Sequence, residues 1–136
     1  MEEIIQKYLQ KGEFKKALNL LEIYKDKESN NVALNYYFGK VYFQLNDHKK
    51  SLYYFRKCNQ INPGNPRILY NLAQVLQGQG KIDEAKKIYE KLIKQNSTDI
   101  KSYYGLFNLG IKNINDDHEI KLQKLSNDKK VNLFDK

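Results

Sequence analysis

Histidine and cysteine are the residues of this chain that could most readily act in catalysis or bind a metal. The sequence holds two histidines, His48 and His118, and one cysteine, Cys58. Neither histidine has a second histidine four residues away, and a single cysteine supplies neither a disulfide partner nor a metal-binding cysteine pair. We therefore predict no metal site, no cofactor and no enzymatic activity.

Glycines in the middle of the chain are a second candidate, because glycine-rich loops can bind phosphate groups. Gly78 and Gly80 follow one segment with helical spacing of apolar residues and precede another. A phosphate-binding loop instead needs a strand before it and a correctly placed lysine after it, and this arrangement is missing. The two glycines therefore predict a turn between helices.

Tyrosines and basic residues remain as candidate binding groups, and they recur along the chain. Tyr36, Tyr70 and Tyr104 are spaced 34 residues apart. Three segments around them contain no aspartate or glutamate: 32–46, 66–82 and 100–115. The basic residues in these segments include Lys40, Arg67, Lys101 and Lys112. Tyrosine rings bury a large contact area and cations attract acidic groups, so this pattern predicts a positive binding surface.

The recurrence belongs to a longer repeat. Residues 32–65 and 66–99 are two copies of one 34-residue pattern, and fragments of it flank both. Each copy contains two segments of helical apolar spacing, with breaks at 45–47 and 77–80 and second helices over about 47–60 and 82–95. A fixed period of this length predicts helix pairs that bury their apolar faces against neighbouring pairs. Asp47 and Asp83 suit the N-terminal ends of the second helices.

The spaced residues resemble those of the tetratricopeptide repeat family. The second copy matches the family pattern at Phe38, Gly39, Tyr42, Phe55 and Pro63, and the third at Leu69, Leu72, Ala73, Leu76, Ala85 and Tyr89. The resemblance implies an all-α, right-handed superhelical solenoid of about three repeats plus a capping helix. It also places Cys58 where the family prefers alanine, which indicates a small buried core residue.

The repeat pattern also predicts the organisation of the chain. We expect one domain over residues 1–126, with a loose tail over 127–136. Its repeats cover about 1–31, 32–65 and 66–99, followed by a degenerate repeat over 100–126. In the flanking repeats, a helix over Glu2–Gln10 opens the stack, a helix over 100–112 caps it, and 116–126 form a weak helix or a degenerate repeat half.

In the tetratricopeptide repeat family, the first helix of each unit lines a concave groove that binds extended peptides or a partner's helix. Carried over, the groove residues are Tyr36, Tyr37, Lys40, Phe43, Gln44, Arg67, Tyr70, Asn71, Gln74, Lys101, Tyr104, Asn108 and Lys112. We predict a positive groove that prefers acidic segments. Two alternatives stand beside this prediction: the tyrosines pack adjacent units, and the first helices lack acids because they are buried.

A subclass of the family grips the C-terminal carboxylate of heat-shock chaperones with lysine, asparagine and arginine side chains. The matching positions here are Tyr36, Lys40, Asn71, Lys101 and Gly105, and only Asn71 and Lys101 agree with that subclass. We therefore do not expect a chaperone-tail clamp.

The function that we predict is that of a non-catalytic scaffold or adaptor for a protein partner. The net charge of +8 and the interleaved tyrosines leave RNA binding as an alternative class, and self-association is a third. No apolar run reaches the length of a membrane span, and the opening residues do not resemble a signal peptide. We expect a cytoplasmic, intracellular location.

Overall fold

The computed structural model describes residues 1–110, which form seven α-helices and no strand. The prediction of an all-α fold is confirmed. The helices are α1 (Glu2–Gln10), α2 (Phe14–Tyr24), α3 (Val32–Gln44), α4 (His48–Ile61), α5 (Pro66–Gly78), α6 (Ile82–Gln95) and α7 (Ile100–Asn108).

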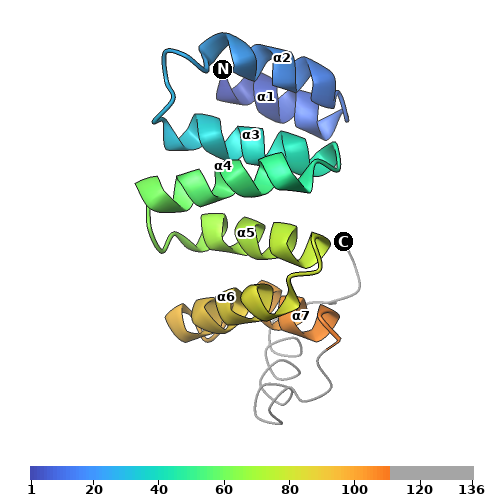
Figure 1. Ribbon diagram of the computed structural model, residues 1–136, viewed down its shortest axis with the longest axis vertical. Helices are drawn as coiled ribbons and strands as arrows, with labels where there is room; N and C mark the ends of the chain where they lie inside the picture. Colours follow the sequence, from blue (N-terminus) through green and yellow to red (C-terminus); the bar gives the residue numbers. More distant parts are fainter. Residues whose placement is uncertain (111–136) are drawn as a thin grey trace.

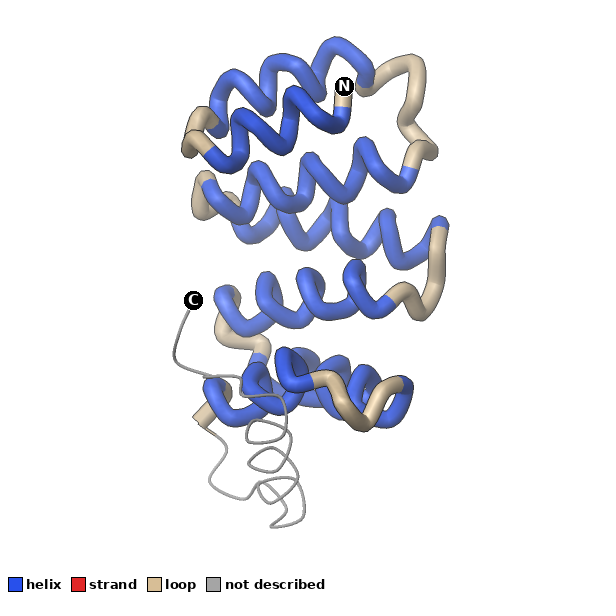
Figure 2. Tube along the Cα trace, turned by 180° about the vertical axis from the view of Figure 1, so that it is seen from behind, coloured by secondary structure: helices blue, strands red, loops and turns tan. Residues whose placement is uncertain are grey.

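Figure 1 shows the helices stacked along the long axis of the molecule, from α1 and α2 at one end to α6 and α7 at the other. Each helix packs against the next one along the chain, and α3 also contacts α5. Seen from behind, the connections lie along the two edges of the stack (Figure 2). Contacts between neighbours in sequence are what a stacked-repeat fold requires. None of the seven helices is long and apolar enough to cross a membrane.

The turns inside the helix pairs use residues that tolerate positive φ. Gly12 and Gly80 have φ values of 74° and 77°, and Asn46 takes the equivalent place with φ 62°. The break predicted over 77–80 is therefore shorter than expected, because α5 continues through Gly78 and the chain reverses at Gly80.

The expected N-terminal residues of the second helices differ from each other. Asp47 caps α4, and its side chain accepts a hydrogen bond from the Lys50 backbone N–H at 3.1 Å. Asp83 is not the N-cap of α6. Lys81 holds that position without a side-chain bond, and Asp83 lies in the first turn, where its carboxylate still complements the helix dipole.

Small residues in the core make room for aromatic rings. A methyl group at Gly39 would lie 2.8 Å from ring carbons of Phe55, and one at Gly105 would lie 2.5 Å from those of Tyr89. Ser51, which is fully buried, donates a hydrogen bond of 2.7 Å to the Gly39 carbonyl. The two helices of the second unit can approach closely only because Gly39 and Ser51 carry no larger side chain.

Two helix ends differ from the repeat pattern. Helix α2 ends at Tyr24, so seven residues, 25–31, connect it to α3, whereas four residues connect α4 to α5 and α6 to α7. Helix α7 ends at Asn108 instead of residue 112, and Gly110 follows with φ 69°. Lys112, the predicted segment 116–126 and the predicted tail 127–136 lie outside the described residues.

Candidate functional site

A groove of about 650 Å³ runs across α3, α5 and the start of α7. It is lined by Tyr36, Lys40, Pro66, Arg67, Tyr70, Asn71, Gln74, Asp99 and Lys101. Seven of these are predicted site residues, and they come from three successive repeats. The structure therefore brings together side chains that are up to 65 residues apart in the sequence (Tyr36 to Lys101).

Tyr36 forms a wall within this site. Its side chain is only 8% exposed, and its ring packs edge-on against Phe55 at a centroid distance of 5.8 Å. Its hydroxyl accepts hydrogen bonds from Arg67 Nε and Asn71 Nδ2, each at 3.1 Å. Tyr36 therefore joins α3 to α5, which agrees with the alternative that this tyrosine packs adjacent units.

The cations of the groove are held against tyrosine rings. The Arg67 guanidinium lies 5.2 Å from the centre of the Tyr36 ring, and Lys40 Nζ lies 5.6 Å from it. Lys101 Nζ lies 6.0 Å from the Tyr70 ring, at the same 31-residue separation that joins Tyr36 to Arg67. The electron-rich ring faces attract these cations and restrict their motion. The repeat thus places a positive charge beside a tyrosine at each junction between these units.

Sequence reasoning missed two residues of this groove, Pro66 and Asp99, and of these Asp99 is charged. It precedes α7 and lies one residue before the acid-free segment 100–115, so the count of acids by segment excluded it. A carboxylate from the loop before α7 therefore stands in the groove that we predict to be positive. The Asp99 carboxylate accepts a hydrogen bond of 2.7 Å from the Ser102 hydroxyl. With Lys40, Arg67 and Lys101, it leaves the compartment with a net charge of +2.

Burial, and then the negative charge of Asp99, raises the pKa of Tyr70 above its ordinary value. The Tyr70 hydroxyl therefore stays protonated at neutral pH. It accepts a hydrogen bond from Gln74 Nε2 at 3.4 Å. The groove wall is accordingly built from neutral hydroxyls and amides between the cations, and these groups can donate to or accept from a bound backbone.

A second, smaller compartment of about 170 Å³ lies beyond the Tyr36–Arg67 contact, toward α1. It is lined by Glu2, Val32, Ala33, Tyr36, Tyr37, Asn62, Asn65, Arg67 and Ile68. The predicted site residue Tyr37 lies here, and its hydroxyl accepts a hydrogen bond of 2.9 Å from Gln6 Nε2 on α1. Tyr36 and Arg67 line both compartments, so their contact separates one from the other.

The remaining predicted site residues line neither compartment. Phe43 packs edge-on against His48 at 5.2 Å, and Tyr104 is half-buried in α7. Gln44 and Asn108 are exposed at the ends of their helices. The predicted residues that line the two compartments extend to Lys40 in α3, to Gln74 in α5 and to Lys101 in α7.

The candidate reactive side chains Cys58 and His48 are packed against other parts of the fold. Cys58 is fully buried, and burial raises the pKa of its thiol to about 12, so it is protonated and unreactive at neutral pH. The His48 ring packs so closely on α5 that a methyl group at Gly78 would lie 2.5 Å from it. Within residues 1–110, no cluster of three histidine, cysteine, aspartate or glutamate side chains could hold a metal ion. His118 lies outside the described residues.

Residues 42–106 match the tetratricopeptide repeat family model. No curated protein sequence matches the chain.

Solved structures share its fold at low sequence identity. The first tetratricopeptide domain of Spaghetti (RPAP3), bound to the HSP90 peptide SRMEEVD, superposes with a TM-score of 0.72 and 18% identity. That alignment covers 79% of this chain and 86% of the other. MamA superposes with a TM-score of 0.78 and 18% identity, over 94% and 75% of the two chains. A mutant O-GlcNAc transferase of Thermobaculum terrenum gives 0.78 and 12%, but only 24% of that chain is covered, against 91% of this one.

Proposed function

Because this chain is a tetratricopeptide repeat protein, we propose that it acts as a non-catalytic scaffold or adaptor whose groove holds an acidic or mixed-apolar segment of a protein partner. Tetratricopeptide repeats are protein-interaction modules. The three units over 1–31, 32–65 and 66–99 work here as one domain, and α7 completes the groove wall. The observation that carries the proposal is the gathering of Lys40, Arg67 and Lys101 around one compartment.

The shape and charge of the groove support a peptide ligand. Its lining comes from three helices, so a bound segment crosses several repeat units. Three cations against one carboxylate attract acidic side chains, while Asn71 and Gln74 offer amides to a peptide backbone. The tyrosine rings add apolar contact area between the charges.

The RPAP3 domain shares this fold at 18% identity, and the peptide bound by that protein, SRMEEVD, is acidic. A fold of this kind can therefore hold a ligand of the class proposed here. The clamp residues expected for a chaperone tail match this chain at Asn71 and Lys101 only. The proposed partner is therefore an acidic segment in general and not a chaperone tail.

Charge reversal in the groove tests the proposal. The variant Lys40→Glu/Arg67→Glu/Lys101→Glu should bind a fluorescein-labelled peptide of alternating glutamate and leucine roughly tenfold or more weakly than the wild type, by fluorescence anisotropy. Circular dichroism should show unchanged helix content. Unchanged affinity in this variant would remove the groove from the proposal.

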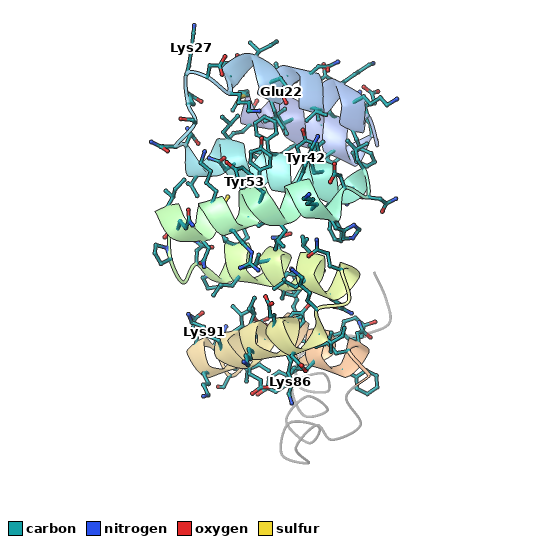
Figure 3. All side chains as sticks on the ribbon, viewed as in Figure 1. Glu22, Lys27, Tyr42, Tyr53, Lys86 and Lys91 are labelled. Carbon is teal, nitrogen blue, oxygen red and sulfur yellow. The ribbon has the colours of Figure 1, made fainter. Side chains whose placement is uncertain are left out.

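A matched control separates the groove from the overall charge. Lys49, Lys87 and Lys91 lie on α4 and α6, are exposed, and line neither compartment. Figure 3 shows Lys91 on α6. Reversing these three changes the net charge by the same amount and should leave peptide affinity nearly unchanged. A titration with single-stranded RNA at low and physiological salt tests the nucleic-acid alternative, which requires steep salt dependence.

A further inference from the structure

Carboxylates stand at the α1 end of the groove, and cations predominate at the other end. At the α1 end, Glu2 lines the smaller compartment, and Glu3 lies beside it in the same helical turn. Both are exposed, and neither forms an ion pair with another described residue. Arg67, which lines both compartments, balances Glu2 in the smaller one, so the excess of carboxylates lies only at the α1 edge. The predicted groove residues begin with the second unit and therefore do not include Glu2.

Helix α1 is held in a defined orientation toward the groove. The Gln6 amide donates its 2.9 Å hydrogen bond to Tyr37 on α3, and Ile5 is fully buried beneath it. Glu2 stands one helical turn before Gln6, so its carboxylate lies on the same face of α1. The acidic end is therefore a regular part of the groove wall.

The opposite charge lies beyond the wall made by Tyr36 and Arg67. There, Lys40, Arg67 and Lys101 surround the larger compartment, and the tyrosine rings keep them in place. The Tyr36 hydroxyl, with bonds from both Arg67 and Asn71, fixes this wall. A segment lying along the groove must therefore meet carboxylates over α1 and cations over α5 and α7.

We infer that the groove selects a charge-polarised partner segment, with a basic side chain over α1 and an acidic side chain over α5 and α7. This inference rests on the proposed function and names the chemistry of its ligand. The exposed pairs each contribute little, but a segment of uniform charge meets repulsion at one end. Complementary charge at both ends therefore sets which partners bind and in which register.

The arrangement also predicts the spacing of the two charges in the partner. Helix α1 is bonded to α3 through Gln6 and Tyr37, and α3 contacts α5, so two interhelical distances of roughly 8–10 Å each separate α1 from α5. An extended chain covers this total distance in about five or six residues, and a helix covers it in about 11–13 residues.

Peptides of equal length test the inference on the full chain. The charge-polarised peptide carries Lys-Lys at one end, a linker of about five neutral residues, and Glu-Glu at the other end. The all-acidic peptide has the same linker with Glu-Glu at both ends. A second pair repeats these two designs with a linker of about 12 residues, which suits a helical ligand. The net charge of +8 alone favours the all-acidic peptides. We expect a charge-polarised peptide to bind roughly three- to tenfold more tightly than its all-acidic counterpart, by fluorescence anisotropy.

Variants at α1 complete the test. Glu2→Lys/Glu3→Lys should reverse the order of the two peptides, whereas Asp83→Lys/Glu90→Lys on α6, with the same change of net charge, should not. Three results would overturn the inference. The all-acidic peptide could bind as tightly as the charge-polarised one or more tightly, or neither charge-polarised peptide could bind. The order of the two affinities could also stay the same in Glu2→Lys/Glu3→Lys. If Lys40→Glu/Arg67→Glu/Lys101→Glu still weakens both peptides, the proposed function stands without it. If that triple variant weakens neither, the proposed function falls as well.

Discussion

The second and third repeats follow the same 34-residue pattern, yet they fill their cores differently. Between α3 and α4, the rings of Phe38, Tyr42 and Tyr54 are stacked nearly parallel, with Phe38 and Tyr54 only 4.6 Å apart. Between α5 and α6, leucine and alanine side chains fill most of the corresponding space. The repeat therefore sets where volume must be placed, while the residue types that supply it vary.

The large ring of the second helix shows this difference most clearly. Phe55 lies against Gly39 of its own unit, whereas the equivalent ring, Tyr89, lies against Gly105 of the following helix. The third unit has Ala73 where the second has Gly39, so its ring finds space at the next junction. Tyr89 also packs edge-on against Tyr70 of its own unit at 6.0 Å, as Phe55 does against Tyr36 at 5.8 Å. The two rings therefore differ in which glycine leaves space for them.

Removing the ring of the second unit should have the largest effect. Phe55→Ala leaves a cavity between α3, α4 and the Tyr36 ring, and should lower the free energy of unfolding by about 3–5 kcal/mol in urea titrations. Phe55→Leu, which keeps most of the volume, should cost much less. A loss below about 1 kcal/mol for Phe55→Ala would mean that the second unit does not depend on this ring.

Adding a methyl group at Gly39 or at Gly105 should distinguish packing within the second unit from packing between the third unit and α7. Gly39→Ala and Gly105→Ala should each cost about 1–2 kcal/mol, because overpacking against a buried ring outweighs the gain in helix propensity. Hydrogen exchange should then accelerate in α3 and α4 for Gly39→Ala, but in α7 for Gly105→Ala. Phe55→Leu should rescue Gly39→Ala in a double-mutant cycle, and it should leave Gly105→Ala without rescue.

Alkaline pH should act on the second unit through Cys58, whose place in the third unit is taken by Leu92. The ordinary thiol pKa is 9.0, and burial raises it to about 12 in the folded chain. The unfolded chain therefore loses its proton first. The contribution of the buried Cys58 thiol to the free energy of unfolding is therefore intact below about pH 9. It is lost as the pH rises toward 12, by up to about 1.4 kcal/mol per pH unit. Cys58→Ala should reduce this slope between pH 9 and 11, and an equal slope would contradict the assignment.

The smallest effect should come from the buried hydroxyl that distinguishes the second unit. Ser51 donates to the Gly39 carbonyl, whereas its counterpart Ala85 makes no such bond. Ser51→Ala should cost about 0.5–1.5 kcal/mol in denaturant unfolding. Ser51→Val should cost more, since it also adds volume where the two helices meet. A neutral Ser51→Ala would show that the close approach of α3 and α4 needs small size alone.

Much of the architecture could be predicted from the spacing of apolar residues. Helices α1 and α6 have the predicted bounds, and α4 is shifted by one residue. The errors lie at helix ends: α5 continues through Gly78, and α7 stops at Asn108. Periodicity reports which face of a helix is buried, but the last turn depends on local backbone geometry such as the positive φ at Gly80 and Gly110.

The sequence by itself determined the period, the order of the helices and the positions of rings and small residues, because these are properties of the chain read against a fixed repeat. It also placed Lys40, Arg67 and Lys101 on first helices. Only the tertiary structure decided that Arg67 bonds to Tyr36, and that Glu2 and Asp99 line the compartments on either side of that contact. These contacts join different repeat units, so their geometry depends on how each helix pair packs on the next.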